Sequence, residues 1–213
     1  MVRLFETPPT LPQGDSLALE AVASADAMAA KLVAGELDAA VLPVNLAAKL
    51  YTSGLPYRLA AVVGQGMVSV VTTDPAVRTF NDLAGRETYV AGQGATPEYL
   101  LRTIARAKGL DPDRDLNLIF RLPYPEIAAS IAAGRISTAV LPEPFATLAL
   151  QGNPQARTPF SLDSLWTQAT GRPGYPMSVF VLRDSLIRDR PRAARALMDA
   201  YEASIAWVKS HPS

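Results

Sequence analysis

The sequence predicts an α/β fold built in two lobes, with parallel sheets flanked by helices. Apolar and β-branched runs of strand length alternate with segments of helical periodicity, which is typical of parallel sheets. The stretch GELDAAVLPVNLA, from Gly35 to Ala47, recurs as GRISTAVLPEPFA, from Gly134 to Ala146, 99 positions further along. Two apolar strands, Met67–Asp74 and Tyr175–Arg183, flank the second copy. We therefore expect the chain to cross twice between the lobes.

Strands are predicted wherever β-branched or apolar residues run for four to seven positions between turn signals. These segments are Leu17–Ala23, Ala39–Leu42, Leu59–Val63, Val68–Thr72, Thr88–Ala91, Leu116–Phe120, Thr138–Leu141 and Ser178–Leu182.

Helices are predicted where apolar residues recur with a period near 3.6. Asp26–Ala34 has Ser24 or Asp26 available as the N-cap, and Thr96–Lys108 follows a glycine-rich loop. Pro191–Lys209 is the longest predicted helix, and its proline suits the first helical position.

The repeat predicts one helix, strand and helix unit in each lobe. Aligned from Ala29 and Ala128 over 22 positions, nine residues are identical. Each copy is interpreted as a helix, a glycine that ends it in the left-handed conformation, a buried strand, a proline and a second helix. Chance similarity between two alanine-rich units is the alternative. The coincidence of the glycine with Val-Leu-Pro and the helix that follows favours a shared structure.

This organisation predicts the lobes and the location of a site. Lobe one comprises residues 1–72 and 177–213, lobe two comprises residues 73–176, and the two crossing strands serve as a hinge. A ligand is expected in the cleft between the lobes, where carboxyl ends of parallel strands and N-termini of helices converge.

Composition excludes several classes of chemistry. The 213 residues carry a formal net charge of zero, no cysteine and one histidine, His211. Thiol nucleophiles, disulfides, Cys/His metal sites and histidine acid/base catalysis are thereby excluded, and no cofactor or metal is predicted. The scattered charges argue against a nucleic-acid partner, and no apolar run is long enough for insertion into a membrane. Met1–Gly14 lacks the features of a signal peptide.

Three longer stretches carry a resemblance to a known family. They are AKLVAGELDAAVLPVNLAAKLYTSG, FNDLAGRETYVAGQGATPEYLLRTIARAKGLDP and IAAGRISTAVLPEPFATLAL. In this order they resemble the periplasmic solute-binding proteins of ABC transporters of the nitrate, sulfonate, taurine and pyrimidine-precursor type, over roughly residues 20–210. The resemblance implies a two-lobed, type II periplasmic-binding fold without catalysis, which captures a small polar or anionic organic solute and delivers it to a membrane permease.

The chain also departs from that family pattern. Members begin with a further strand, loop and helix, for which Met1–Asp15 is too short and too rich in proline, and they continue past the position of Ser213. Lobe one is therefore expected to lack its first strand and helix. Because the chain resembles a form shortened at both ends, the missing signal peptide does not indicate a cytoplasmic protein. The resemblance implies a periplasmic or lipid-anchored extracytoplasmic location.

The loop GQGATPE, Gly92–Glu98, is the first candidate for binding the solute. Thr96 is expected as the N-cap and Pro97 as the first helical residue, so backbone N–H groups near Gln93, Gly94 and Ala95 would face an anionic head group. The alternative is an ordinary strand-to-helix turn in which Glu98 already satisfies part of the helix dipole.

Other candidates lie at equivalent loops and at the crossings. In lobe one, Val44 and Asn45 follow the repeated strand, and Asn45 offers both a donor and an acceptor. In lobe two, Glu143 would pair with a solute amine or ring nitrogen, or would merely favour the positive end of a helix dipole. Gln65, Gly66 and Met177 lie at the crossings.

Aromatic residues supply a further set of candidates for stacking on a solute ring. Tyr124 is preferred because Pro123 and Pro125 hold it just before a helix, and Trp166 and Tyr175 lie near the crossings. Packing between the lobes is the alternative role for such residues.

Two other functions fit the same fold. One is an enzyme, such as the menaquinone-pathway dehydratases or the pyrimidine-forming proteins; the latter depend on histidine and cysteine, whereas a dehydratase needs only carboxylates and water. The other is the effector-sensing domain of a transcription regulator, which requires a DNA-binding segment upstream.

Overall fold

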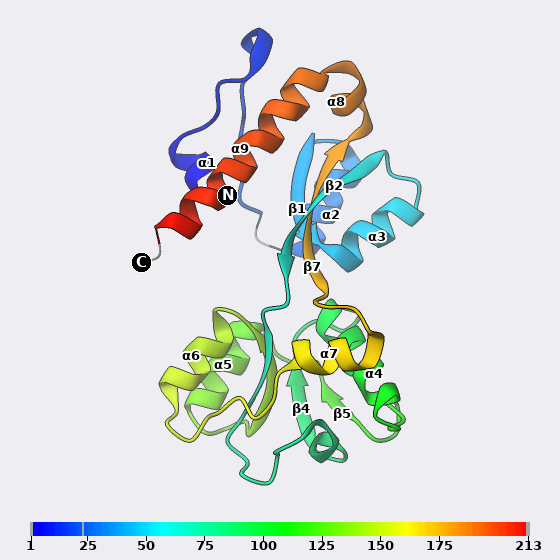
Figure 1. The fold of residues 1–213 in the computed structure, drawn as a ribbon, viewed down its shortest axis with the longest axis vertical. Coiled ribbons are helices and arrows are strands. Elements are labelled where there is room, and N and C mark those ends of the chain that lie inside the picture. Colours follow the sequence, from blue (N-terminus) through cyan, green and yellow to red (C-terminus); the bar gives the residue numbers. More distant parts are fainter. Residues whose placement is uncertain (1, 23, 212–213) are drawn as a thin grey trace. The chain divides into compact units, whose positions relative to one another are not determined.

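The computed structural model describes residues 2–22 and 24–211, and it divides into two compact units (Figure 1). Unit 1 comprises Met1–Val62 and Ser178–Ser213, and unit 2 comprises Val63–Met177. Each unit has a sheet flanked by helices, which confirms the predicted α/β class.

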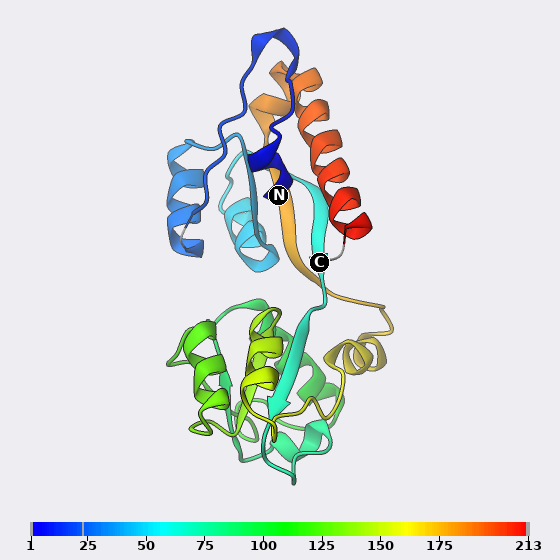
Figure 2. The same cartoon turned by 90° about the vertical axis from the view of Figure 1, so that its left-hand side faces the viewer.

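Unit 1 is built on a three-stranded sheet with helices on both faces. The strands are β1 (Ala39–Pro43), β7 (Pro176–Arg183) and β2 (Tyr57–Gln65), in the order β1-β7-β2. Helices α2 (Ala25–Ala34) and α3 (Val44–Thr52) cover one face and α9 (Pro191–Ser210) covers the other (Figure 2). On the α9 face, the Phe180 ring stacks on Tyr201 with centroids 4.9 Å apart. The remaining elements are α1 (Val2–Glu6), η1 (Pro12–Gly14) and α8 (Asp184–Asp189).

The predicted strand Leu17–Ala23 is wrong for the residues that the structure describes. Residues 17–22 form no strand, and Ala23 lies outside the described residues. Apolar character alone does not produce a strand, because the backbone of a strand also needs a partner. In this segment Glu20 instead forms an ion pair with Lys31 of α2, at 3.2 Å.

Unit 2 is built on a four-stranded sheet in the order β3-β6-β4-β5. These strands are Val68–Thr72, Thr138–Pro142, Glu87–Val90 and Asn117–Ile119, respectively. The helices are η2 (Phe80–Leu83), α4 (Thr96–Ala107), α5 (Tyr124–Ala132), α6 (Phe145–Gly152) and α7 (Leu162–Thr170). Val140 of β6 packs into one core cluster, whereas Ala139 and Leu141 pack into another. Because side chains alternate along a strand, β6 is buried on both faces.

The sheets are mixed rather than purely parallel, which corrects one detail of the prediction. Strand β4 is parallel to β5 and β6, as expected. Strand β7 is antiparallel to β1, and β3 is antiparallel to β6. Strand β7 spans one boundary between the units, whereas β3 lies wholly within unit 2 and follows β2, the strand that spans the other boundary.

The two copies of the repeat have the same local structure. Strands β1 and β6 occupy equivalent positions, 99 residues apart. Before each strand a helix ends at a glycine with positive φ, 72° at Gly35 and 68° at Gly134. Gly35 N donates to Leu32 O and Gly134 N donates to Ile131 O, at 3.1 and 3.0 Å. These bonds confirm the predicted glycine helix ends.

The copies differ after the strand. Helix α3 begins at Val44, directly after Pro43, whereas α6 begins only at Phe145. The expectation that Pro142 starts the next helix is therefore wrong for the second copy. Pro144 disfavours the helical conformation at the residue before it, Glu143, and so delays the helix.

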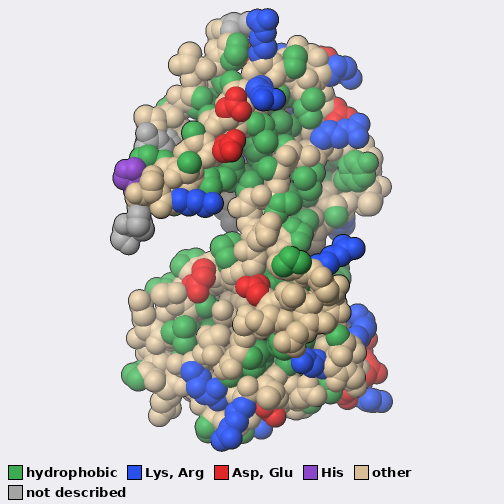
Figure 3. Space-filling model, viewed as in Figure 1, with side chains coloured by type: hydrophobic (Ala, Val, Ile, Leu, Met, Phe, Trp, Pro, Cys, Tyr) green, Lys and Arg blue, Asp and Glu red, His purple; other side chains and the backbone are tan. Residues whose placement is uncertain are grey.

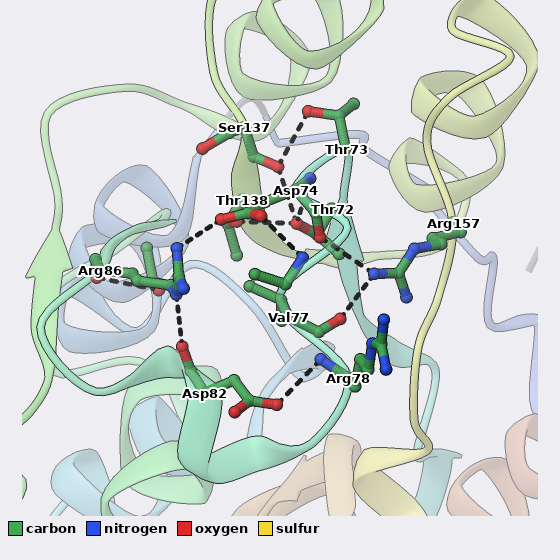
Figure 4. A network of polar contacts seen from close by, with 12 residues as sticks. Thr72, Thr73, Asp74, Val77, Arg78, Asp82, Arg86, Ser137, Thr138 and Arg157 are labelled. Atoms are coloured by element: carbon green, nitrogen blue, oxygen red, sulfur yellow. Dashed lines mark hydrogen bonds and ion pairs between the residues drawn. The ribbon is translucent and has the colours of Figure 1, made fainter.

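A network of hydrogen bonds and ion pairs lies at the amino ends of β4 and β6 (Figure 4). The Arg86 guanidinium bonds Asp74 at 2.5 Å, and Arg157 donates to the carbonyl oxygens of Asp74 and Val77. The buried Thr72 and Thr138 hydroxyls bond each other at 2.9 Å. Polar groups at this edge are thus largely satisfied by one another, as expected of a structural edge.

Candidate functional site

The opposite edge of the unit 2 sheet collects most of the residues that the sequence singled out. The carboxyl ends of β4, β5 and β6 lie there together with the amino end of β3, because Val68 pairs with Pro142 and Val90 with Val140. Gln65, Gly66, Gln93, Gly94, Ala95, Thr96, Tyr124 and Glu143 adjoin these strand ends. Glu143 N donates to Met67 O at 3.0 Å, which ties two of the loops together.

The loop between β4 and α4 turns through two glycines. Gly92 and Gly94 have φ of 77° and 75°, a conformation that favours glycine. Ala95, not Thr96, is the N-cap of α4, so Thr96 is the first helical residue and Pro97 the second. The predicted capping role of Thr96 is therefore wrong. The Glu98 carboxylate accepts the Gly94 N–H at 2.7 Å, which replaces a conventional N-cap side chain.

This arrangement changes which groups of the loop are open to a solute. Gly94 N is bonded to Glu98, and Ala95 N is bonded to Gly92 O at 3.1 Å. Glu98 is buried and also accepts a bond from Arg102 Nε at 2.7 Å, and this pairing raises the pKa of Arg102. The dipole of α4 is thus partly neutralised from inside the protein. The Gln93 amide is exposed, and the Thr96 side chain beside it is half-buried.

Tyr124 joins α5 to this loop. Its hydroxyl donates to Ala91 O at 3.4 Å, directly after β4, and burial raises its pKa. Its ring stacks on Phe145, with centroids 5.7 Å apart and planes 16° apart. One face of the Tyr124 ring is therefore occupied by packing.

Glu143 caps α6. Its carboxylate accepts bonds from Thr147 N at 3.2 Å and Thr147 Oγ1 at 2.7 Å. The side chain is exposed but bonded to the first turn of the helix, which is the dipole role considered as the alternative for this residue.

The connection between β2 and β3 is a tight turn at the same edge. Gly66 and Met67 have φ of 65° and 69°, and Gly66 N donates to Tyr175 O at 3.1 Å. Positive φ is rare for a methionine, and Met67 is also half-exposed. The sequence analysis missed Met67, for which the preceding glycine was the only available signal of a turn.

Met177, Trp166 and Tyr175 pack on the core of unit 2. The two aromatic rings meet edge to face with centroids 5.8 Å apart. Within the described part of the chain, Trp166 Nε1 and the Tyr175 hydroxyl are buried without a hydrogen-bond partner. Burial raises the pKa of Tyr175, so its hydroxyl stays protonated. These contacts describe packing within unit 2.

In unit 1, Val44 and Asn45 begin α3 directly after β1. Both side chains are half-buried, and Val44 lines a cavity of about 370 Å³.

Neither a metal centre nor a membrane span was found among residues 2–22 and 24–211. No group of three or more His, Cys, Asp or Glu side chains in that part of the chain is placed to hold a metal ion. None of the helices described there is both long and apolar enough to cross a bilayer.

The model of the NMT1-like family matches residues 11–212, nearly the whole sequence. The chain belongs to the NMT1-like family. No curated protein matches the sequence.

Three solved structures similar to this NMT1-like chain are an ABC transporter structure and two sulfonate-binding proteins. An ABC transporter structure from Parabacteroides distasonis is 28% identical, with a TM-score of 0.78 over 99% of this chain and 69% of its own. The periplasmic aliphatic sulphonate binding protein SsuA of Escherichia coli is 16% identical, with a TM-score of 0.70 over 88% of this chain. The alkanesulfonate-binding protein SsuA of Xanthomonas axonopodis pv. citri, bound to MOPS, is 17% identical, with a TM-score of 0.65 over 88% of this chain.

The NMT1-like chain spans 61% and 62% of the lengths of these two SsuA proteins. At such identities the similarity to them shows the fold, which is that of periplasmic binding proteins. The family match and this fold together confirm the family resemblance noted in the sequence.

Proposed function

We propose that this protein is the solute-binding component of an ABC importer and captures a small polar or anionic organic solute without altering it. The observation that carries the proposal is the similarity to the Parabacteroides distasonis ABC transporter structure over 99% of the chain. By the same inference the protein works outside the cytoplasm, in the periplasm or on a lipid anchor, and passes its solute to a permease.

We assign the solute contacts of unit 2 to the carboxyl edge of its sheet. There we assign polar contacts to Gln93 and Thr96 and an apolar contact to the Tyr124 ring, with Met177 as a further candidate next to the core of the unit. Gly94 and Ala95 allow close approach of a solute to the backbone. Gln65, Gly66 and Glu143 border the same edge. Open ends of parallel strands are where α/β sheets generally bind ligands.

In unit 1 the corresponding position is the start of α3, where Val44 and Asn45 follow the first copy of the repeated strand. The repeat thus supplies one candidate position to each unit, directly after its strand. Asn45 offers a donor and an acceptor to a polar group.

The first experiment identifies the solute. Protein purified under native conditions is denatured, and the released small molecules are identified by mass spectrometry. Binding is then measured by calorimetry with that solute and with a panel of ethanesulfonate, hexanesulfonate and MOPS, chosen because SsuA proteins share the fold. We expect a released organic solute or saturable binding of one panel member. Failure of both would contradict the proposal.

Substitution of Ala95 tests the site. Ala95→Asp places a carboxylate beside the loop while providing a favoured N-cap, so the protein should fold normally. Repulsion should weaken binding of an anionic solute by roughly tenfold or more. Ala95→Asn is the matched control, since asparagine has nearly the same shape and caps equally well without the charge. Equal affinity of the two variants for an anionic solute would move the binding site away from this loop.

The absence of turnover is tested with the same solute. Incubation with the protein should return the solute chemically unchanged. Formation of a product at a rate proportional to protein concentration, and abolished by Glu143→Gln, would instead identify an enzyme.

A further inference from the structure

Unit 1 contains a cavity of about 370 Å³ that the proposed function does not use, apart from its border at Val44. It lies between α3 and the β2 end of the sheet, with Leu32, Leu42, Leu50 and Val181 among its lining residues. Sites for small molecules typically have volumes of about 300–1,000 Å³ and a mainly apolar lining. The cavity therefore has the size and the surface of a small-molecule site.

Charge at the cavity is already paired. Arg58 is the one charged residue in its described lining, and its guanidinium makes two bonds to the Asp184 carboxylate, at 2.8 and 3.2 Å. The hydroxyl of Tyr57 is likewise engaged, because it donates to Leu37 O at 2.7 Å. A charged ligand would gain no free counter-charge here and would lose its hydration. The lining thus favours an uncharged occupant.

The second copy of the repeat shows that such a cavity does not follow from the repeated sequence. Helix α3 has no buried residue, although Val44, Ala47 and Leu50 face the core cluster. In copy two the equivalents of Ala47 and Leu50 are Ala146 and Ala149, which are 1% and 0% exposed. In the first copy a cavity therefore remains beneath α3, even though Leu50 is larger than its equivalent, Ala149.

The mouth of the cavity is also apolar. Tyr51 and Leu59 border it and are 58% and 59% exposed. Large exposed apolar side chains at the rim of a cavity often mark a binding site, because removing them from water is favourable. An aromatic or short aliphatic molecule that fills the cavity would cover both.

We propose that this cavity is a second binding site, which takes a neutral apolar molecule of one or two rings or a comparable aliphatic chain. The site lies wholly within unit 1. It does not depend on the proposed function, and the two proposals fail independently.

The test uses N-phenyl-1-naphthylamine, an uncharged probe whose fluorescence rises in apolar surroundings. We expect saturable binding to the full chain. Ala47→Phe fills the cavity from α3 and should weaken binding roughly tenfold or more through steric exclusion. Ala129→Phe, on an exposed position of α5 in unit 2, is the matched control and should leave binding unchanged. Absence of binding, or equal binding by all three proteins, would overturn the proposal.

Two further measurements address misfolding of the first variant and the charge of the ligand. If circular dichroism shows that Ala47→Phe is misfolded, Leu59→Asp at the exposed mouth takes its place and should likewise abolish the fluorescence rise. The chemical class is tested with 1-anilinonaphthalene-8-sulfonate, which has the same ring system and a negative charge. Equal affinity for this probe, lost in the same variants, would overturn the assignment of a neutral ligand.

Discussion

The two copies of the repeated unit share their sequence pattern but differ in how deeply they are buried. In β6, the first four of five residues are buried, whereas in β1 buried residues alternate with half-buried ones. Strand β6 lies between β3 and β4, while β1 lies at the end of its sheet order. Local sequence therefore sets the helix end and the strand, whereas neighbouring strands and helices set the packing.

The two copies should differ most in the free energy of unfolding that is lost when a buried aliphatic residue before each strand is truncated. Leu32 and Ile131 are equivalent and are 2% and 0% exposed, but Leu32 lines the unit 1 cavity. Because Leu32 already borders open space, Leu32→Ala should lower the free energy of unfolding by about 2 kcal/mol and Ile131→Ala by about 4 kcal/mol. Urea unfolding measures both, and equal losses would contradict the proposed difference in packing.

The two tryptophans allow the units to be monitored separately. Trp166 lies in unit 2, and Trp207 lies in unit 1, where its ring stacks on His211 with centroids 4.5 Å apart. Trp166→Phe and Trp207→Phe backgrounds would therefore assign each fluorescence transition to one unit.

A somewhat smaller difference in the free energy of unfolding is expected for substitutions in the helix that follows each strand. A Cβ at Gly152 would lie 2.5 Å from Ala132 Cβ, so α6 approaches α5 too closely for a side chain. Gly152→Ala should reduce the free energy of unfolding by roughly 1–3 kcal/mol, because the helices must separate. The equivalent residue in copy one is the exposed Ser53, so Ser53→Ala serves as the matched control. If Gly152→Ala left the free energy of unfolding unchanged, copy two would be no more tightly packed than copy one.

Replacing the glycine at the helix end should reduce stability equally in the two copies. Gly35 and Gly134 both have positive φ, and an added Cβ would meet nothing closer than 3.5 Å at Gly35 and nothing within 4 Å at Gly134. Gly35→Ala and Gly134→Ala should each reduce stability by about 1 kcal/mol through backbone strain alone. Clearly unequal losses in urea unfolding would mean that the copies do not share this helix end.

The smallest effect should come from removing one acid-sensitive carboxylate of unit 2, that of Asp82. Bonds from the Thr79 and Arg78 backbone N–H groups hold the pKa of Asp82 below its usual range. Its stabilising contribution is therefore present above the pKa of the unfolded chain and is lost as pH falls through the lower, folded value. Asp82→Asn should flatten the pH dependence of the Trp166 transition and leave that of Trp207 unchanged. A parallel change in both transitions would show that the units do not unfold separately.

Much of the fold could be predicted because strand and glycine signals are local. The predicted strand Val68–Thr72 coincides with β3, and both glycine helix ends were found. Leu17–Val22 has the composition of a strand but no partner, and composition does not reveal pairing. The direction of β7 likewise depends on its neighbour β1 rather than on its own residues.

The candidate site was predictable in location but not in detail. Loops that follow parallel strands gather at one sheet edge, and the loops of Gln93 and Glu143 do so. The partners of individual groups depend on side-chain rotamers and helix starts. The sequence analysis allowed Glu98 to satisfy part of the helix dipole, but its bond to Gly94 N required the structure.

The strand order of unit 1 has a consequence for biosynthesis. Strand β7 lies between β1 and β2 in the sheet, yet it is translated after both of them. Unit 2 is one continuous segment, so it can fold on the ribosome while β1 and β2 still wait for the strand that joins them. During that interval the backbone N–H and C=O groups of β1 and β2 that later pair with β7 lack that partner, and unpaired strand edges favour aggregation.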